Sequence, residues 1–277
     1  MFATDRGDGN LPRLDIQTIL ERIETDTART LRAEREAVEI PPFLAAFHRT
    51  DDMIWLNYAI PIAPTADPAA VQSALPRLRE EFHRRKRVLR FEYLAARHAT
   101  LAGHLEAAGL ARQLAAPLMV CSAADVCAIA PPPGFDLCRL EAGAPEADLA
   151  DFRRAGKQGF GDTAAAVQPF EIEELRDALR LGRWRCLLAR HQGAAVGVGT
   201  FCTGNSELAG VATLPQFRRH GVAAAVSSGL LVEHFAAGGN WAWLSAADEV
   251  ARALYRKVGF QDGGVQLNYM DGRPPGE

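Results

Sequence analysis

A basic turn that carries a glycine separates a strand-like segment from an alanine-rich segment in this sequence. Residues 211–214 favour a short strand, Pro215 ends it, the basic tetrad 216–219 (Gln-Phe-Arg-Arg) follows, and Gly221 opens the alanine-rich segment. The first turn of a helix has N–H groups without partners and partial positive charge. Gly221 lets the backbone approach an anion closely, and arginines supply charge-assisted hydrogen bonds. The segment therefore predicts an anion site, of the kind that holds a phosphate at a helix N-terminus.

A second segment of interest lies about 30 residues further on, where residues 251–260 read A-x-x-L-Y-x-K-x-G-F. Together the two segments resemble the GNAT superfamily of N-acetyltransferases, over roughly residues 137–270. The resemblance implies acyl transfer from acetyl-CoA, with the turn around its pyrophosphate and the main chain of the preceding strand along its pantetheine arm. The cofactor-binding residues that it implies are Val211, Ala212, Thr213, Arg218, Arg219, His220, Gly221, Val222, Ala223 and Asp248.

The resemblance implies a catalytic role for Tyr255, as the acid that protonates the departing thiolate. The usual pKa values of a phenol and a thiol, about 10 and about 8.5, are close enough for that transfer. The alternative is a core aromatic, because Tyr255 shares a helix face with Ala251 and Val258. A further difference concerns Asp248, since the family often has Asn seven residues before the tyrosine. A carboxylate there could cap the helix instead of binding the cofactor.

A general base is also needed, because an alkylammonium with a pKa near 10 must lose a proton before it attacks a thioester. Glu207 begins the strand before the basic turn and is the best carboxylate on position. Its alternative is an exposed residue at a strand end. His191, expected in a hairpin turn, and His234, expected on a solvated helix face, are weaker candidates.

The second half of the chain predicts an α/β (α+β layered) domain with a mixed central sheet flanked by helices. An antiparallel hairpin precedes a strand-helix-strand unit, in the order β-α-α-β-β-β-α-β-α-β. The expected strands are 137–140, 184–190, 194–202, 207–214, 241–245 and 265–270, and the expected helices are 148–156, 170–181, 222–238 and 248–257.

The first half of the chain has a similar order of predicted elements but lacks the basic turn. Residues 53–122 read strand, helix, strand, helix, strand, after a long amphipathic helix at 14–39. The counterpart of the basic turn, residues 61–68, has no glycine and no arginine, and Asp67 would repel phosphate. We therefore expect a degenerate GNAT-like domain at 1–130 that closes the acceptor pocket, or an unrelated cap, and a catalytic GNAT domain at 136–277. The proline-rich segment 128–135 is the expected linker.

The composition excludes several classes of protein. The 277 residues carry a net charge of −3, which gives no bulk signal for nucleic acid or an anionic membrane. The basic run 84–87 fits a solvated helix end better than a nucleic-acid adaptor. The segment 1–11 lacks the character of a targeting peptide and is expected to be loose, and the five cysteines read as reduced core thiols of a cytoplasmic protein. No metal-ligand spacing, Walker P-loop or nucleophile elbow is present, so we expect no metal.

The sequence thus predicts a cytoplasmic N-acetyltransferase that moves an acyl group from acetyl-CoA directly to a primary amine. The alternative is a catalytically silent module that binds CoA for regulation or structure, because fold alone does not fix function. The acceptor stays open among small antibiotics, polyamines, amino acids and peptide N-termini, and the chain could be a monomer or a homodimer. No partner in the form of a nucleic acid or a membrane is expected.

Overall fold

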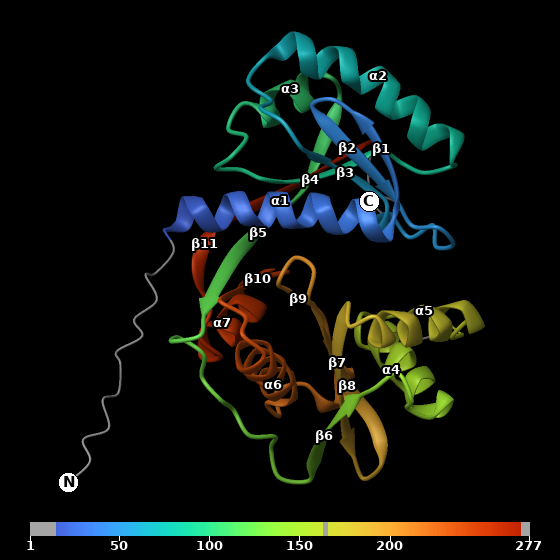
Figure 1. Cartoon of the computed structure of the whole chain (residues 1–277), viewed down its shortest axis with the longest axis vertical. Coiled ribbons are helices and arrows are strands. Elements are labelled where there is room, and N and C mark those ends of the chain that lie inside the picture. The colour runs from blue at the N-terminus through green and yellow to red at the C-terminus, as the bar shows by residue number, and fades with distance from the viewer. Residues whose placement is uncertain (1–14, 163–165, 273–277) are drawn as a thin grey trace, which may run out of the picture.

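The strands of this protein form one mixed sheet in a computed structural model, which describes residues 15–162 and 166–272. The sheet has 11 strands in the order β1-β2-β3-β4-β11-β5-β10-β9-β8-β7-β6 (Figure 1). The mixed α/β fold class is therefore confirmed. The expectation for residues 1–11 lies outside the described residues.

The C-terminal half, residues 136–277 as predicted, has the expected order of elements. Two β-hairpin connections and the strand-helix-strand unit are all present. The elements are β6 (Phe135–Leu140), α4 (Glu146–Gly159), α5 (Pro169–Arg180), β7 (Trp184–His191), β8 (Ala194–Cys202), β9 (Glu207–Thr213), a 3-10 turn η2 (Pro215–Phe217), α6 (Val222–Ala236), β10 (Trp241–Ser245), α7 (Glu249–Lys257) and β11 (Gln261–Asp271).

The N-terminal half, residues 1–130 as predicted, also contains the expected strand-helix-strand-helix-strand series. Its elements are α1 (Ile16–Glu34), β1 (Glu36–Ile40), β2 (Phe43–Phe47), a 3-10 turn η1 (Ile54–Leu56), β3 (Tyr58–Pro61), α2 (Pro68–Arg84), β4 (Arg90–Leu94), α3 (Leu101–Ala107) and β5 (Leu110–Ser122). Whether the two halves are separate domains stays a prediction.

Two expectations for the N-terminal half are wrong. The first helix ends at Glu34 rather than at 39, and the segment 36–47 forms the hairpin of β1 and β2 instead. The expected strand at 53–60 begins only at Tyr58. The side chain of Asn57 explains the delay, because its amide donates to the carbonyls of Asp51 and Met53 and holds the chain in a turn.

The two halves exchange their last strands. β5 pairs with β10 of the C-terminal half, and β11 pairs with β4 of the N-terminal half, while β5 and β11 pair with each other. Each half also contains one parallel pair that meets at a single register point, Ala59 with Phe91 in β3 and β4, and Glu207 with Trp243 in β9 and β10. Strands that touch at one point diverge beyond it, so both halves contain a gap in the sheet.

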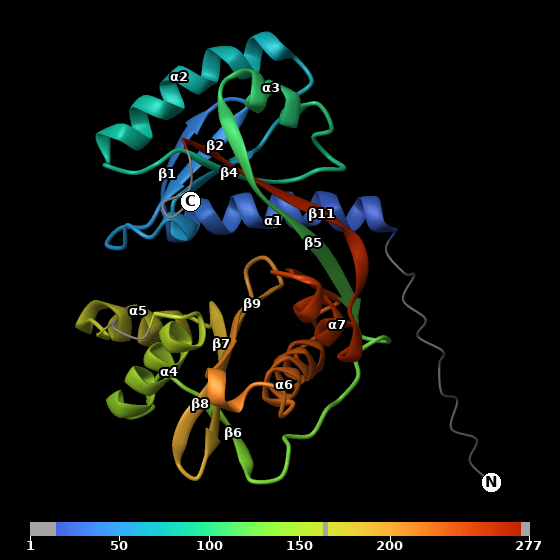
Figure 2. The same cartoon turned by 180° about the vertical axis from the view of Figure 1, so that it is seen from behind.

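Helix α1 joins the two halves on one face of the sheet (Figures 1 and 2). Its first part packs Leu20 and Ile23 against Trp243 of β10, and its last part packs Leu31 against Leu44 of β2. Helices α4 and α5 cover the same face further along the C-terminal half, whereas α6 and α7 cover the opposite face. On this face of the sheet, α1 covers one part and α4 and α5 cover another. The stretch of the sheet between α1 and the α4–α5 pair is left accessible.

Candidate functional site

The gap between β9 and β10 is the first feature of the candidate site. The strands meet where Glu207 lies beside Trp243, and the Trp243 N–H donates to the carbonyl of Ser206 at 3.0 Å. β9 has no further register partner on β10 towards Thr213. The rest of β9 therefore borders an opening in the sheet.

The main chain of β9 faces this opening at alternate residues. The Leu214 N–H donates to the Val196 carbonyl at 2.9 Å, so Leu214 is turned towards β8. Because bonded and non-bonded pairs alternate in an antiparallel ladder, Ala212 is also turned towards β8, and Thr213 and Val211 face the gap. A bulge at 210–211 shifts the register at this point. The predicted contacts of Val211 and Thr213 with an extended ligand fit this geometry, whereas the main chain of Ala212 points elsewhere.

The basic turn lies at the end of the gap and begins helix α6. Arg219 and Gly221 have φ values of +68° and +89°, and the glycine accepts this left-handed conformation without strain. Gly221 is the N-cap of α6 and makes no side-chain capping bond. The first helical bond runs from the Ala225 N–H to the Gly221 carbonyl, so the N–H groups of Val222 and Ala223 precede the ladder and are available to an anion.

Arg218 holds this turn in place. Its Nε donates to the Thr213 carbonyl at 3.2 Å and its Nη2 donates to the Gly159 carbonyl at 2.8 Å. Two of its donors are therefore used within the protein, which ties the turn to β9 and to α4. Arg219 and His220 are exposed beside it, and the ring of His220 bonds the carbonyl of Arg218.

Glu207 is half-buried at the point where β9 and β10 separate. Burial raises the pKa of its carboxyl to about 7, against the stabilising hydrogen bond from Asn205, and the charge of Glu92 raises it further. The Asn205 amide donates to Oε2 of Glu207 at 3.0 Å and fixes the orientation of the carboxyl. A carboxyl with a pKa near neutrality can exchange protons with an amine at physiological pH.

Tyr255 lies on the other side of the sheet, in the apolar cluster under α6 and α7. Its ring packs edge-on against Phe260, with centroids 5.8 Å apart. Burial, and then the charge of Asp248, raises the pKa of the phenol to about 12. The phenol thus keeps its proton at neutral pH, and the raised pKa makes it a weaker acid towards a thiolate than an ordinary phenol. Both alternatives for Tyr255 are compatible with this position.

Asp248 caps helix α7, because its Oδ1 accepts from the Ala251 N–H at 2.7 Å. This is the alternative that the sequence left open for it. The two histidines are less suited to proton transfer. His191 lies at the end of β7, where its ring bonds the Gly134 carbonyl. The solvated position expected for His234 is wrong, since the ring stacks on Phe201 at 4.2 Å and is buried.

Burial also lowers the pKa of His234, and its Nε2 bonds the Trp241 carbonyl at 2.9 Å. The sequence did not show this because α6 is apolar on nearly all sides, so its helical pattern has no distinct solvated face. Among the cysteines, Cys121 and Cys186 are buried as predicted, whereas Cys127 is exposed just before the proline-rich segment 128–135.

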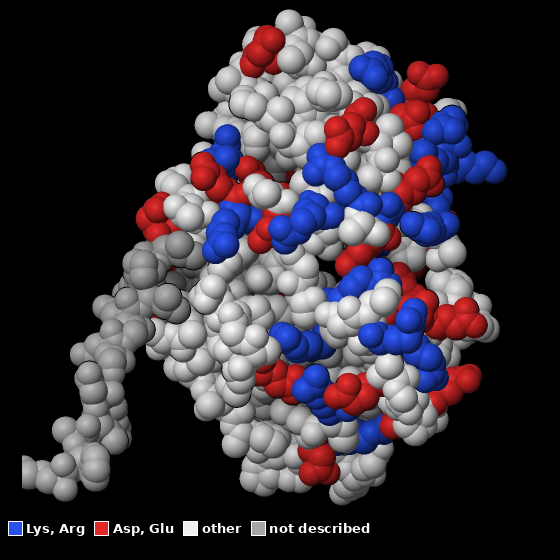
Figure 3. Space-filling view, in the orientation of Figure 1, with Lys and Arg blue, Asp and Glu red and all other residues white. Residues whose placement is uncertain are grey.

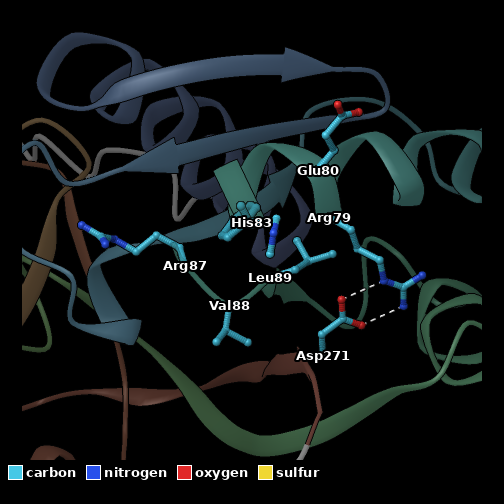
Figure 4. Close-up of a pocket in the computed structure, with 8 residues that line it drawn as sticks. Arg79, Glu80, His83, Arg87, Val88, Leu89 and Asp271 are labelled. Atoms are coloured by element: carbon cyan, nitrogen blue, oxygen red, sulfur yellow. Dashed lines mark hydrogen bonds and ion pairs between the residues drawn. The ribbon is translucent and has the colours of Figure 1, made fainter. Parts of the chain in front are cut away.

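A cavity of about 390 Å³ lies on the same face as Glu207, between the two halves. Its walls come from the end of α1, the end of β2, helix α5 and the start of β7. Figure 3 shows side chains of both charges gathered along this seam, where the surface is hollowed. A second cavity of about 440 Å³ lies on the N-terminal half beside α2, where Arg79 and Asp271 pair through two bonds of 2.7 Å (Figure 4).

The sequence did not predict which residues lie near Glu207 in space. Asn205 lies in the turn before β9, and Glu92 belongs to the N-terminal half. The only signal in the sequence was the polar Asn205 two positions before Glu207. In the described ranges, no group of three or more His, Cys, Asp or Glu side chains could hold a metal ion. None of the helices described is long and apolar enough to cross a membrane.

Comparison with known proteins gives a family match and several structural matches. The model of the acetyltransferase (GNAT) domain matches residues 182–262, which include the gap, the basic turn, Glu207 and Tyr255. No curated protein matches the chain. A GCN5-related N-acetyltransferase from Kribbella flavida has 24% identity and a TM-score of 0.74, over 92% of this chain and 96% of that chain.

Two further solved structures extend this likeness. A GCN5-related N-acetyltransferase from Sphaerobacter thermophilus has 16% identity and a TM-score of 0.64, over 92% of this chain and 90% of that chain. A tandem GNAT protein from the clavulanic acid biosynthesis pathway has 14% identity and a TM-score of 0.57, over 94% of this chain and 95% of that chain. These likenesses show the fold, and the tandem protein is consistent with an arrangement of two domains. The predicted resemblance is confirmed: the chain has the GNAT fold, and its residues 182–262 match the model of the acetyltransferase (GNAT) domain.

Proposed function

We propose that this protein is a cytoplasmic N-acetyltransferase that transfers the acetyl group of acetyl-CoA directly to a primary amine. The observation that carries the proposal is the gap between β9 and β10, which has an uncapped helix N-terminus at its end and a carboxyl of raised pKa at its start. Residues 136–277 would form the catalytic domain. Residues 1–130 would form a degenerate GNAT-like domain that closes the acceptor side.

Acetyl-CoA, as the cosubstrate, supplies the activated acetyl group. The N–H groups at the start of α6 would hold its pyrophosphate, and Arg219 would add a positive charge from the exposed side of the turn. The main-chain groups of Val211 and Thr213 that face the gap would bind the pantetheine arm. Arg218 supports this indirectly, because it fixes the turn to the Thr213 carbonyl.

In this proposal the two ionisable groups, Glu207 and Tyr255, act from opposite faces of the sheet. Glu207 would accept the proton of the acceptor ammonium, so that the free amine forms a bond to the thioester carbonyl carbon. The carbon–sulfur bond then breaks, and Tyr255 would donate its proton to the leaving thiolate. The amide loses its extra proton to solvent or to the phenolate, which restores Tyr255.

Titration calorimetry with acetyl-CoA tests the proposed cofactor site. We expect one molecule to bind per wild-type chain, and we expect Gly221→Glu to weaken binding by at least about 100-fold, since it places a carboxylate at the phosphate position and strains the turn. Gly238→Glu is a matched control, because Gly238 has the same φ of +89° at the other end of α6. Absence of binding by the wild type would overturn the proposal.

Tyr255→Phe tests the acid role. We expect kcat to fall about 10- to 100-fold, within the range of general acid catalysis, while acetyl-CoA binding is kept. Release of free thiol over a panel of amines measures turnover and also separates an enzyme from a silent CoA-binding module. An unchanged rate in this variant would leave Tyr255 as a core aromatic.

A further inference from the structure

The cavity between the two halves lies on the same face of the sheet as Glu207, two strands away from it. Trp184, which lines the cavity, lies opposite Cys202 of β8, and Cys202 lies opposite Glu207 of β9. Directly opposite side chains of an antiparallel pair share a face. Neighbouring strands are about 4.8 Å apart, so this row spans roughly 10 Å. A small molecule in the cavity can therefore extend an amine towards Glu207.

Two arginines of the cavity wall have buried donors without partners. Nη1 of Arg35 and Nε of Arg183 are shielded from solvent, and neither makes a hydrogen bond within the described part of the chain. Their main chains are held firmly, since the Arg35 N–H donates to the Leu31 carbonyl at 2.9 Å and the Arg183 N–H to the Ala178 carbonyl at 2.8 Å. A buried charged donor without a partner costs more than a neutral one, so these positions favour an anionic ligand.

Two of the four carboxylates in the cavity wall are bonded to other side chains. Glu174 bonds His48 at 2.8 Å and Arg153 at 3.2 Å, and Asp177 bonds Arg180 at 3.1 Å. Glu34 lies near both Arg35 and Arg183, and burial raises its pKa in spite of their attraction. The side chains of Glu34 and Glu173 make no hydrogen bond within the described ranges, but the buried polar atoms of the wall that lack a partner are those of Arg35 and Arg183.

Arg35 also connects the cavity to the candidate base. The charges of Arg35 and Glu207 both act on the phenol of Tyr58 and on the thiol of Cys202, with opposite effects on their pKa values. A positive group and a carboxyl therefore lie around the same two side chains. This polarity matches a ligand with a carboxylate at one end and an amine at the other.

We propose that the acceptor is an amine that also carries a carboxylate, an amino acid or a short peptide, with its carboxylate bound by Arg35 and Arg183 and its amine directed to Glu207. The guanidinium fork matches a carboxylate in geometry and charge. Arg35 comes from the N-terminal half and Arg183 from the C-terminal half, so the acceptor site needs both. This inference rests on the proposed acetyltransferase function and names its substrate class.

Matched pairs of acceptors that differ only by the carboxylate provide the test. We would compare L-lysine with cadaverine, L-phenylalanine with phenethylamine, and glycylglycine with its amide, by release of thiol from acetyl-CoA. The best pair should favour the carboxylate-bearing member by about 10- to 100-fold in kcat/KM, as expected for charge-assisted hydrogen bonds. Equal or better turnover of the members without a carboxylate, in every pair, would overturn the inference.

Substitutions in the cavity wall identify the groups responsible. Arg35→Met and Arg183→Met should each lose about 10- to 100-fold in kcat/KM for the carboxylate-bearing member and change the other member less than about threefold. Arg35→Lys should recover part of the loss. Arg32→Met is the matched control, because Arg32 lies in the last turn of α1, directly before Arg35 at its C-cap, and pairs with Glu39 at the surface. An equal loss for both members of the pair would point to a structural role.

Calorimetry separates this inference from the proposed function. Acetyl-CoA binding should be the same in Arg35→Met as in the wild type, which also shows that the variant folds. If acetyl-CoA does not bind to the wild type, the proposed function fails. The cavity is then tested alone by titrating the same amino acids and amines, and absence of any preference for the carboxylate would overturn the inference as well.

Discussion

The two halves of this protein contain the same gap with opposite chemistry. In the C-terminal half, β9 and β10 diverge beyond Glu207 and Trp243, and main-chain groups face the opening. In the N-terminal half, β3 and β4 diverge beyond Ala59 and Phe91. At the register point, the first strand of the pair carries the carboxyl of Glu207 in the C-terminal half and the methyl group of Ala59 in the N-terminal half.

The loops that follow the first strand of each pair differ in the same sense. The N-terminal loop buries Thr65, whose hydroxyl bonds Nδ1 of His98 at 3.0 Å, and Nε2 of His98 bonds Glu24 of α1 at 3.0 Å. This chain of bonds joins the loop after β3 to the loop after β4. The corresponding place in the C-terminal half is bordered by the basic turn and the uncapped start of α6.

The helix N-termini complete the comparison. Asp67 caps α2 by accepting from the Ala69 N–H at 2.9 Å, so a fixed carboxylate of the protein occupies the anion position. Gly221 leaves that position open in α6. The topology thus supplies a gap in both halves, and a few loop side chains decide whether a ligand can use it.

The largest expected effect concerns Glu207, which has no counterpart in the N-terminal half. Glu207→Gln should lower kcat/KM at pH 7 by about 100- to 10,000-fold, because the amide cannot accept the ammonium proton. The wild-type rate should rise with pH through about 7, and the variant should lose that rise. Thiol release measured from pH 5.5 to 9 checks both results, with acetyl-CoA binding unchanged. A variant that keeps the wild-type pH profile would remove Glu207 from the mechanism.

The same carboxyl should reduce stability as the pH rises. Its pKa is raised to about 7 in the folded state, so between its usual value of 4.5 and about 7 the folded protein binds more protons than the unfolded chain. The free energy of unfolding then falls with rising pH, by up to about 3 kcal/mol from this group. Urea unfolding of the wild type and of Glu207→Gln at pH 5 and pH 8 measures this free energy. The free energy of unfolding of the variant should exceed that of the wild type only at pH 8. An equal difference at both values would contradict the raised pKa.

Much of this contrast was visible in the sequence, because it lies in short contiguous segments. The basic turn at 218–221, the strand-helix order of the second half and the acidic, glycine-free loop at 61–68 depend on local chemistry, and the fold class and the family resemblance followed from them. The sequence did not predict the tertiary contacts. The bonds of Arg218 to Thr213 and Gly159 join segments up to 59 positions apart.

The acceptor side was hidden for the same reason. Glu92 near Glu207, and Arg35 in the same cavity wall as Arg183, are brought together only when the two halves pack against each other. No local sequence pattern predicts that the two halves exchange their last strands, or that β1 and β2 form a hairpin. The charge of a residue can be read locally, whereas its desolvation depends on which distant segment covers it.

Breaking the bonds of the N-terminal loop is the next test of the comparison. Thr65→Val should lower the free energy of unfolding by about 1–3 kcal/mol, because it leaves Nδ1 of the buried His98 without a partner. Acetyl-CoA affinity should stay within about twofold, since the C-terminal gap is untouched. Thr25→Val is a control on an exposed threonine of α1 whose side chain makes no hydrogen bond within the described ranges, with an expected change below about 0.5 kcal/mol. A loss of acetyl-CoA affinity in Thr65→Val would show that the N-terminal gap contributes to cofactor binding.

The smallest expected effect concerns the cap of α2. Asp67→Ala should lower the free energy of unfolding by about 1 kcal/mol, the usual cost of removing an N-cap side chain, and should leave one acetyl-CoA bound per chain. Asp67→Asn keeps the cap without the charge and should stay within about 0.5 kcal/mol of the wild type, which separates capping from repulsion. Chemical unfolding measures the first quantity and titration calorimetry the second. A second molecule of acetyl-CoA bound by either variant would mean that one carboxylate, rather than the bonded loop behind it, keeps the N-terminal gap closed.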